Sequence, residues 1–216
     1  MRVAAGVFAD RADAGRRLAL LLEPLRDGAP VVVGMARGGV AVAAEVAAVL
    51  GAPLDVVVVR KLGCPGQPEL GLGALGEEGV RIVNERLVQR LGVTDEVIDE
   101  VAGRETVELE RRRARYRAGR PPTPVAGRPV VVVDDGLATG FTARAAVEVM
   151  RRRRAGRVVV AVPVGSPGAV ASLEAVADEV VCVETAGEFF GISEWYRDFH
   201  QVSDDEVARL LATPRP

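Results

Sequence analysis

The chain has 216 residues and a formal net charge of −2, a length typical of one domain or of one domain with a small appendage. The near-neutral charge argues against a general binder of nucleic acid or acidic membranes, and two cysteines are too few for a disulfide framework. No apolar run approaches the ~20 residues of a membrane span, and the N-terminus becomes polar too early for a signal peptide, so we expect a cytoplasmic protein.

Valine-rich runs alternate with alanine- and arginine-rich stretches along the chain. Runs of β-branched residues without polar alternation are typical of strands buried on both faces, as in a parallel sheet. The stretches between them have helical spacing, and this alternation indicates a doubly wound α/β fold with a mainly parallel, five-stranded sheet and flanking helices. The predicted sheet strands cover residues 31–33, 56–59, 130–133, 158–164 and 179–185.

Helices are predicted in the intervals between these strands. The first covers 10–25 with Asp10 as its N-cap, and a short strand over 2–8 precedes it. A long helix over about 94–118 has acids in its first turn and arginines in its last, which matches the helix dipole. The remaining predicted helices cover 40–50, 142–154, 169–177 and a final segment capped by Ser203.

The segment over about 60–80 interrupts the alternation. It is rich in glycine and proline, a composition typical of a flexible loop. A short strand over 80–83 follows it and leads to the long helix. We therefore predict a flexible loop between the second sheet strand and this short strand.

The run VVVVDDGLATGFT carries the strongest chemical signal. A buried strand delivers Asp134 and Asp135 to its carboxyl end, where open α/β sheets bind ligands. Small residues and two threonines follow just before a helix, so backbone amides and hydroxyls can surround an anion there. An acidic pair beside such a loop suits a sugar phosphate, because carboxylates hold vicinal hydroxyls while the loop holds the phosphate.

This run resembles the 5-phosphoribosyl 1-diphosphate (PRPP) signature of type I phosphoribosyltransferases. The resemblance implies that Asp134 and Asp135 bind the ribose hydroxyls and contact Mg²⁺ indirectly, through ribose or water. It also implies a loop for the 5′-phosphate, formed by Ala138, Thr139, Gly140, Phe141 and Thr142. Phe141 stands where the family often has glycine, which is tolerable because only its backbone N–H is needed. The alternative is a receiver-like domain whose acidic pair binds a metal, but such domains have no TGxT loop after the acids.

A second segment, GMARGG, follows the first sheet strand and resembles the family's diphosphate loop. The loop residues implied are Ala36, Arg37, Gly38 and Gly39. Glycines expose backbone amides at a helix N-terminus, and Arg37 can form charge-assisted hydrogen bonds with diphosphate oxygens. Glycine after a strand often serves tight packing alone. The interpretation as a diphosphate loop is supported by the position of this turn, directly after the first sheet strand.

Arg60 and Lys61 begin the predicted flexible loop. In the family a loop at this place closes over the site and carries basic residues toward the diphosphate, which also excludes water. Lys61 is the single lysine among 28 lysine and arginine residues, which makes it a candidate for chemistry that arginine cannot do. The alternative for this pair is a solvated strand end.

The C-terminal segment gathers five aromatic residues, of which Phe189, Phe190, Trp195 and Tyr196 are candidate acceptor-binding residues. It resembles the family's hood, the lobe that selects the acceptor, and we divide the chain into a core over 1–185 and a hood lobe with the last helix over 186–216. The alternatives for these aromatics are that they form a small separate hydrophobic core (a satellite core) or that they pack in a subunit interface. Members that act on 6-oxopurines have a lysine just after the last strand, and this chain has none there.

The resemblance implies an Mg²⁺-dependent enzyme that transfers 5-phosphoribosyl from PRPP to a nitrogenous acceptor, such as a nucleobase or related heterocycle, and releases diphosphate. Its implied catalytic residues are Asp134, Asp135, Lys61 and Arg37. A homodimer is expected, with no nucleic-acid or membrane partner. We expect replacement of both aspartates by asparagine to abolish turnover with little change in folding. The alternatives are a non-catalytic sensor of PRPP or nucleotides and a hydrolytic or phosphorolytic step on a ribosyl compound.

Overall fold

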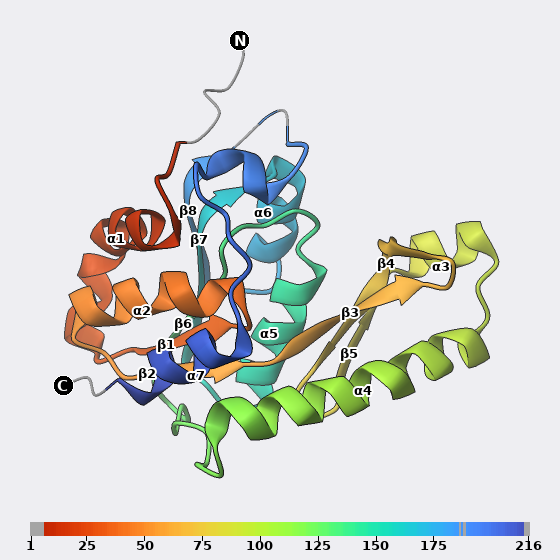
Figure 1. The fold of residues 1–216 in the computed structure, drawn as a ribbon, viewed down its shortest axis with the longest axis horizontal. Helices are drawn as coiled ribbons and strands as arrows, with labels where there is room; N and C mark the ends of the chain where they lie inside the picture. Colours follow the sequence, from red (N-terminus) through yellow and green to blue (C-terminus); the bar gives the residue numbers. More distant parts are fainter. Residues whose placement is uncertain (1–6, 186, 188, 214–216) are drawn as a thin grey trace.

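A five-stranded parallel sheet forms the centre of the fold, as seen in a computed structural model that describes residues 7–185, 187 and 189–213 (Figure 1). Its strands lie in the order β2–β1–β6–β7–β8, and every neighbouring pair is parallel. The predicted fold class is confirmed. The strand bounds are β1 Val31–Met35, β2 Leu54–Val57, β6 Pro129–Val133, β7 Arg157–Gly165 and β8 Glu179–Thr185.

Helices cover both faces of this sheet, so the valines of β1, β2, β6 and β7 are buried on both sides, while those of the edge strand β8 are half-buried. Successive side chains of a strand point to opposite faces. Val32 and Val131 accordingly pack beneath α1 (Arg11–Leu22) and α2 (Gly38–Leu50), whereas Val33 and Val132 pack beneath α5 (Phe141–Arg152) and α6 (Pro167–Glu174). The first predicted helix ends early, since its last residues form a 3₁₀ helix, η1 (Glu23–Gly28).

The segment predicted as a flexible loop over 60–80 is instead most of a second, antiparallel sheet. Its strands are β3 (Val59–Cys64), β4 (Gln67–Gly76) and β5 (Val80–Val83), in the order β3–β4–β5. The loop prediction was wrong because these glycines serve close packing between elements. A Cβ on Gly73 would lie 2.0 Å from the carbonyl oxygen of Ile82 on the neighbouring strand, and one on Gly76 would lie 2.8 Å from a methyl of Val149 on α5.

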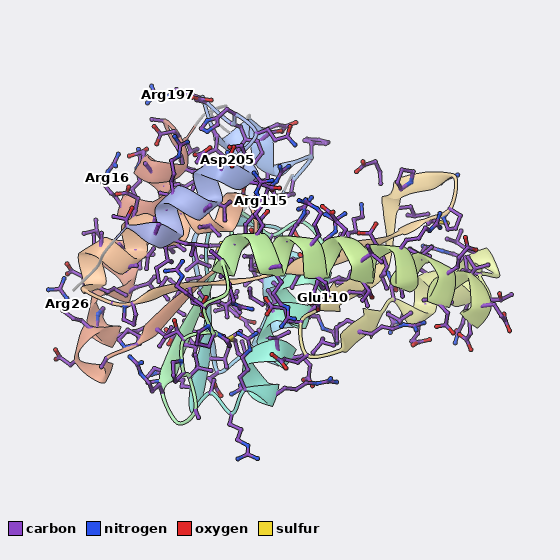
Figure 2. The ribbon with its side chains drawn as sticks, turned by 60° about the horizontal axis from the view of Figure 1, so that its bottom comes forward. Arg16, Arg26, Glu110, Arg115, Arg197 and Asp205 are labelled. Atoms are coloured by element: carbon purple, nitrogen blue, oxygen red, sulfur yellow. The ribbon has the colours of Figure 1, made fainter. Side chains whose placement is uncertain are left out.

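Two helices line the second sheet and extend away from the central one (Figure 1). α3 (Glu85–Leu91) was not predicted, because seven residues are too few to establish a helical period. α4 (Asp95–Arg117) begins after Thr94 as predicted, and Arg115 near its end reaches α7, where it pairs with Asp205 at 2.6 Å (Figure 2).

None of the helices in the described ranges is long and apolar enough to cross a membrane.

A buried ionic cluster fastens the second sheet to the core. Glu77 is 2% exposed and lies at the end of β4. Its carboxylate accepts hydrogen bonds from the backbone N–H of Val58 at 2.7 Å, from Arg117 at 2.5 Å and from Arg153 at 2.7 Å. These partners lie between β2 and β3, at the end of α4 and just after α5, so one carboxylate joins three parts of the chain.

The C-terminal segment contains a short 3₁₀ helix, η2 (Ile192–Trp195), and the final helix α7 (Asp204–Ala212), which Ser203 caps as predicted. Trp195 and Tyr196 are buried in a cluster with Phe8, and the ring centroids of Phe8 and Tyr196 are 5.5 Å apart. The satellite-core alternative therefore holds for Trp195 and Tyr196. Phe8 makes a β-bridge to Tyr196, while residues 2–6 of the predicted first strand lie outside the described residues.

Candidate active site

The strand order places a topological switch point between β1 and β6. The connection after β1 leads to β2 on one side, whereas β6 lies on the other side of β1 and continues toward β7. In open α/β sheets the loops diverge at such a point and leave a crevice outside the carboxyl ends of the strands. The turn over 36–39 follows β1 and the loop over 134–142 follows β6, so both predicted ligand-binding segments begin at the carboxyl ends of the strands that border this switch point.

A cleft of about 460 Å³ opens beside the loop after β6. The second sheet contributes Lys61, Glu69, Gly71 and Gly73 to its walls, and the C-terminal segment contributes Phe190 and Ile192. The loop itself supplies the remaining wall, with Asp134, Gly136, Leu137, Ala138, Thr139, Gly140, Phe141 and Thr142. Three segments far apart in sequence thus surround one space, and every residue predicted for the phosphate loop lines it.

The loop ends at the N-terminus of α5, a helix of 12 residues. Gly140 is its N-cap with φ +79°, a left-handed conformation that glycine adopts without strain. The hydroxyl of Ser166 donates to the carbonyl of Ala138 at 2.8 Å, and the backbone N–H of Leu137 donates to Val164 at 2.9 Å. The loop is therefore tied to the end of β7, and the first amides of α5 have no intrahelical acceptor, which leaves them available to an anion.

The two aspartates after β6 have different surroundings. Asp134 lines the cleft, and one of its carboxylate oxygens accepts the backbone N–H of Asp135 at 2.9 Å. The Asp135 side chain is buried and receives a hydrogen bond from Nε of Arg11 at 2.8 Å. Of the two predicted ribose ligands, the structure therefore brings only Asp134 to the cleft.

Burial raises the pKa of both carboxyls. The pKa of Asp134 lies well above its usual value, first because the group is removed from bulk water and second because Asp135 is a neighbouring negative charge. The pKa of Asp135 is also raised by burial, while the guanidinium of Arg11 opposes this effect. Such adjacent carboxyls with perturbed pKa values are typical of functional sites.

The turn after β1 packs directly against this acid pair. A Cβ on Gly38 would lie 1.9 Å from a carboxylate oxygen of Asp135, and one on Gly39 would lie 2.5 Å from the carbonyl oxygen of Val133. The guanidinium of Arg37 lies 3.9 Å from the carboxylate of Asp204 on α7. Neither Arg37 nor its neighbours Ala36, Gly38 and Gly39 are among the residues that line the cleft.

Replacing Gly39 by alanine is expected to destabilise the protein by about 1–3 kcal/mol, because its Cβ meets backbone atoms that cannot move aside. Thermal unfolding measures the loss. Gly168→Ala is the matched control, since Gly168 also lies in the first turn of a helix and an added Cβ there meets nothing within 4 Å. An equal melting temperature for both variants would contradict the predicted clash.

Lys61 and Arg60 lie on β3 and point to opposite faces, as neighbouring strand residues do. Lys61 lines the cleft, and its ammonium contacts the backbone carbonyl of Glu69 on β4. Arg60 turns toward α4, where its Nε donates to Glu105 at 2.7 Å. The structure thus brings Lys61 to the site and leaves Arg60 in an ion pair outside it.

The C-terminal aromatics divide in a similar way. Phe190 is 82% exposed at the cleft, and Ile192 packs so closely on the loop that a Cβ on Gly136 would lie 2.8 Å from its methyl. Trp195 and Tyr196 are buried in the satellite cluster, and Phe189 packs against it. Only Phe190 among the four predicted hood aromatics faces the cleft.

The donor set at the cleft suits a metal ion that arrives with a ligand. Within residues 7–185, 187 and 189–213, no three His, Cys, Asp or Glu side chains gather in a group able to hold a metal ion. The cleft offers the carboxylate of Asp134 and, at its edge, the exposed carboxylate of Glu69. Mg²⁺ is commonly held by one or two carboxylates together with substrate phosphate oxygens and water. These residues fit an Mg²⁺ ion shared with a phosphorylated ligand.

Arg11 is one of the residues of this region that the sequence did not predict. It lies in the first turn of α1, 124 positions before its partner Asp135. Arginine is abundant throughout the chain, so neither composition nor spacing distinguished Arg11 from the others.

Comparisons with known proteins are consistent with this geometry. A family model described as a phosphoribosyl transferase domain matches residues 11–197. Two curated Mycobacterium tuberculosis proteins, from strains CDC 1551 and H37Rv, are 51% identical to the chain over 205 residues, and both are named provisionally as phosphoribosyl transferases. The match covers 95% of this chain and 46% of each relative, so the chain spans about half the length of these proteins.

Solved structures show the same fold. The crystal structure of TT1426 from Thermus thermophilus is 46% identical in sequence and aligns with a TM-score of 0.79, covering 94% of this chain and 97% of that one. The structure of the AQ2163 protein from Aquifex aeolicus, 13% identical, aligns with a TM-score of 0.50 over 81% of this chain and 74% of that one. The second likeness concerns the fold alone.

Proposed function

Because the chain belongs to the phosphoribosyl transferase domain family, we propose that it transfers a 5-phosphoribosyl group from PRPP to a nitrogenous acceptor and releases diphosphate. The observation that carries the proposal is the cleft, which brings Asp134, the loop over 138–142 and Lys61 together from separate segments. This combination offers a carboxylate for sugar hydroxyls, a helix N-terminus for a monophosphate and a cation for a second anionic group.

In the proposed reaction a nitrogen of the acceptor attacks C1 of the ribose while the bond from C1 to the diphosphate oxygen breaks. The diphosphate leaves with the bonding electron pair, and positive charge develops on the sugar ring. We assign the ribose hydroxyls to Asp134, the 5′-phosphate to the backbone and threonine hydroxyls of 138–142, and the leaving diphosphate to Lys61. The residues act by orientation and by charge neutralisation.

Mg²⁺ is proposed to accompany PRPP. Asp134 would hold it together with substrate oxygens, and the ion would neutralise charge on the diphosphate. The turn over 36–39 is proposed to receive the diphosphate through backbone amides at the start of α2. For Arg37 to join them, its guanidinium has to leave Asp204, from which it lies 3.9 Å away.

The acceptor class is the open part of the proposal. Phe190 is exposed at the cleft and offers a face on which a planar heterocycle can stack. The match covers 46% of the length of the curated relatives, so the proposal concerns the activity of this domain. Cytoplasmic location stays a prediction from the sequence, and a homodimer stays a prediction from the family resemblance.

PRPP with Mg²⁺ is expected to raise the melting temperature. A ligand at one hundred times its Kd stabilises the folded state by about 2.7 kcal/mol, which for this chain length corresponds to roughly 5–11 °C. Ribose 5-phosphate lacks the diphosphate and is expected to give a smaller shift. No shift with PRPP would contradict the proposal. Binding without release of diphosphate across a panel of heterocyclic bases would favour the sensor alternative instead.

Replacing Lys61 by glutamine is expected to lower kcat/KM for PRPP by about 10²-fold, because the leaving diphosphate loses a cation. Steady-state release of diphosphate measures the effect. Arg81→Gln is the control: it removes an ion pair between the same sheet and α4, where Arg81 contacts Asp99 at 2.5 Å outside the cleft. Equal losses of kcat/KM in the two variants would show that Lys61 contributes only to the stability of the second sheet.

A further inference from the structure

We propose that Glu69 is a positioning residue for Lys61. Its backbone carbonyl holds the ammonium at the cleft wall, and in the free site its carboxylate occupies the place on that ammonium which a diphosphate oxygen takes in the complex. The inference rests on the proposed function, because it takes diphosphate as the anion that Lys61 receives. It implies that Glu69 limits how tightly the leaving diphosphate stays bound.

An irregularity in the second sheet brings Glu69 to Lys61. Lys61 on β3 pairs with Ala74 on β4, and in an unbroken antiparallel ladder Glu69 would oppose residue 66, five positions along the chain from Lys61. The pairing instead shifts twice toward the end of β3, and residues 68–70 form a bulge on β4. Bulges of this kind redirect side chains and are common beside active sites. Here the backbone carbonyl of Glu69 accepts a hydrogen bond from the Lys61 ammonium.

The Lys61 side chain lies across bare backbone on the neighbouring strand. A Cβ on Gly71 would lie 3.1 Å from Cε of Lys61 and 3.9 Å from its Cγ, so the glycine leaves the space that the lysine side chain fills. The bulge is packed closely as well, since a Cβ on Gly63 would lie 2.7 Å from the carbonyl oxygen of Pro68. The glycine and the bulge together therefore set the direction in which Lys61 reaches the cleft.

The Glu69 carboxylate is the part of this contact that can leave. It lies 3.8 Å from the Lys61 ammonium, and its side chain is fully exposed. Exposed ion pairs contribute little to stability, because both groups remain hydrated. The backbone carbonyl uses one of the three ammonium donors, so two remain for the carboxylate or for a ligand. Diphosphate carries several negative charges and can therefore replace the carboxylate at little cost.

The charges at the cleft give this exchange a purpose. Among the charged side chains that line the cleft, we assign Asp134 to the ribose and Lys61 to the diphosphate, and Glu69 is the third. A carboxylate beside the diphosphate position competes with the diphosphate for the same ammonium. When the reaction is complete, the return of the carboxylate to Lys61 therefore favours departure of the diphosphate.

The test measures the affinity of inorganic diphosphate by calorimetric titration, with and without Mg²⁺. Glu69→Gln keeps the backbone carbonyl and the side-chain size but removes the charge, and it is expected to bind diphosphate about three- to fivefold more tightly. Glu69→Asp keeps the charge and is expected to stay close to the unmodified chain. The control is Glu105→Gln, which removes the carboxylate paired with the neighbouring Arg60 outside the cleft, and its affinity should be unchanged.

A double-mutant cycle with Lys61 separates occupation of the ammonium from simple repulsion. In a Lys61→Gln background the carboxylate has no ammonium to occupy, so most of the gain from Glu69→Gln is expected to disappear. An equal gain in both backgrounds would mean that Glu69 only repels diphosphate, and it would overturn the inference. Thermal unfolding checks that each variant folds, which is expected because Glu69 is fully exposed.

Two further results would count against the inference. Weaker binding of diphosphate by Glu69→Gln in the presence of Mg²⁺ would show that the carboxylate is a metal ligand instead of a competitor for Lys61. An unchanged affinity would show that the carboxylate does not occupy the ammonium. In either case the proposed function stands as long as the unmodified chain binds diphosphate, whereas failure of the unmodified chain to bind it would overturn both.

Discussion

Replacing Asp134 by asparagine is expected to lower turnover by about 10²- to 10³-fold without loss of thermal stability. The expected fall in rate follows from the proposed role of its carboxylate toward the ribose hydroxyls. The fold should tolerate the change, because the asparagine side-chain oxygen can still accept the backbone N–H of Asp135, which lies at 2.9 Å. Release of diphosphate measures the rate, and thermal unfolding measures the stability.

The raised pKa of Asp134 predicts the direction in which Asp134→Asn changes folding stability. Because its pKa is well above the usual value in the folded state, the folded protein binds a proton that the unfolded chain has already lost. Stability therefore falls as the pH rises from the unfolded pKa through the folded one. Asparagine does not titrate, so Asp134→Asn is expected to melt above the unmodified chain, by a margin that grows with pH until the folded carboxyl has ionised. A variant that is inactive and also melts lower at pH 8 would contradict this account.

Replacing Glu77 by glutamine is expected to cost about 3 kcal/mol of folding stability, because it leaves Arg117 and Arg153 buried without their shared carboxylate. For a chain of this length the melting temperature should fall by roughly 6–12 °C. The second sheet should be affected first, since Glu77 joins it to the ends of α4 and α5. Thermal unfolding measures the total loss, and hydrogen exchange in β3 and β4 locates it.

Glu78→Gln is the matched control for this variant. Glu78 is the next residue and also pairs with Arg153, at 3.2 Å, but its side chain is 45% exposed. Exposed ion pairs contribute about 0–1 kcal/mol, so its removal should shift the melting temperature little. Similar losses for the two variants would show that burial of the Glu77 cluster is not what stabilises the second sheet.

The environment of Asp135 changes how the acid pair should be tested. The sequence led us to expect that asparagine at both positions would abolish turnover with little effect on folding. Asp135 is instead the partner of the buried Arg11, so its replacement also disturbs the contact between α1 and the C-terminal segment. Asp134→Asn alone is therefore the cleaner test of the proposed ribose contact.

Much of the fold was predictable because its signals are local. The valine runs gave the parallel strands, and the caps Asp10 and Ser203 marked helix starts that the structure confirms. The acid pair and the following loop were recognised because a strand, two acids and small residues succeed one another within a few positions. The second sheet was not predicted, because glycines that allow elements to pack closely give the same composition as glycines that make a loop flexible.

The sequence by itself determined the central sheet and the position of the loop at the end of β6, because hydrophobic period, capping and composition can be read along a short stretch. Only the tertiary structure decided which side chains face the cleft. It turned Lys61 inward and Arg60 toward α4, and it separated Asp134 from Asp135 by pairing the latter with Arg11, 124 positions away. The physical reason is that the direction of a buried charged side chain is set by its partner, and these partners come from distant segments that only folding brings together.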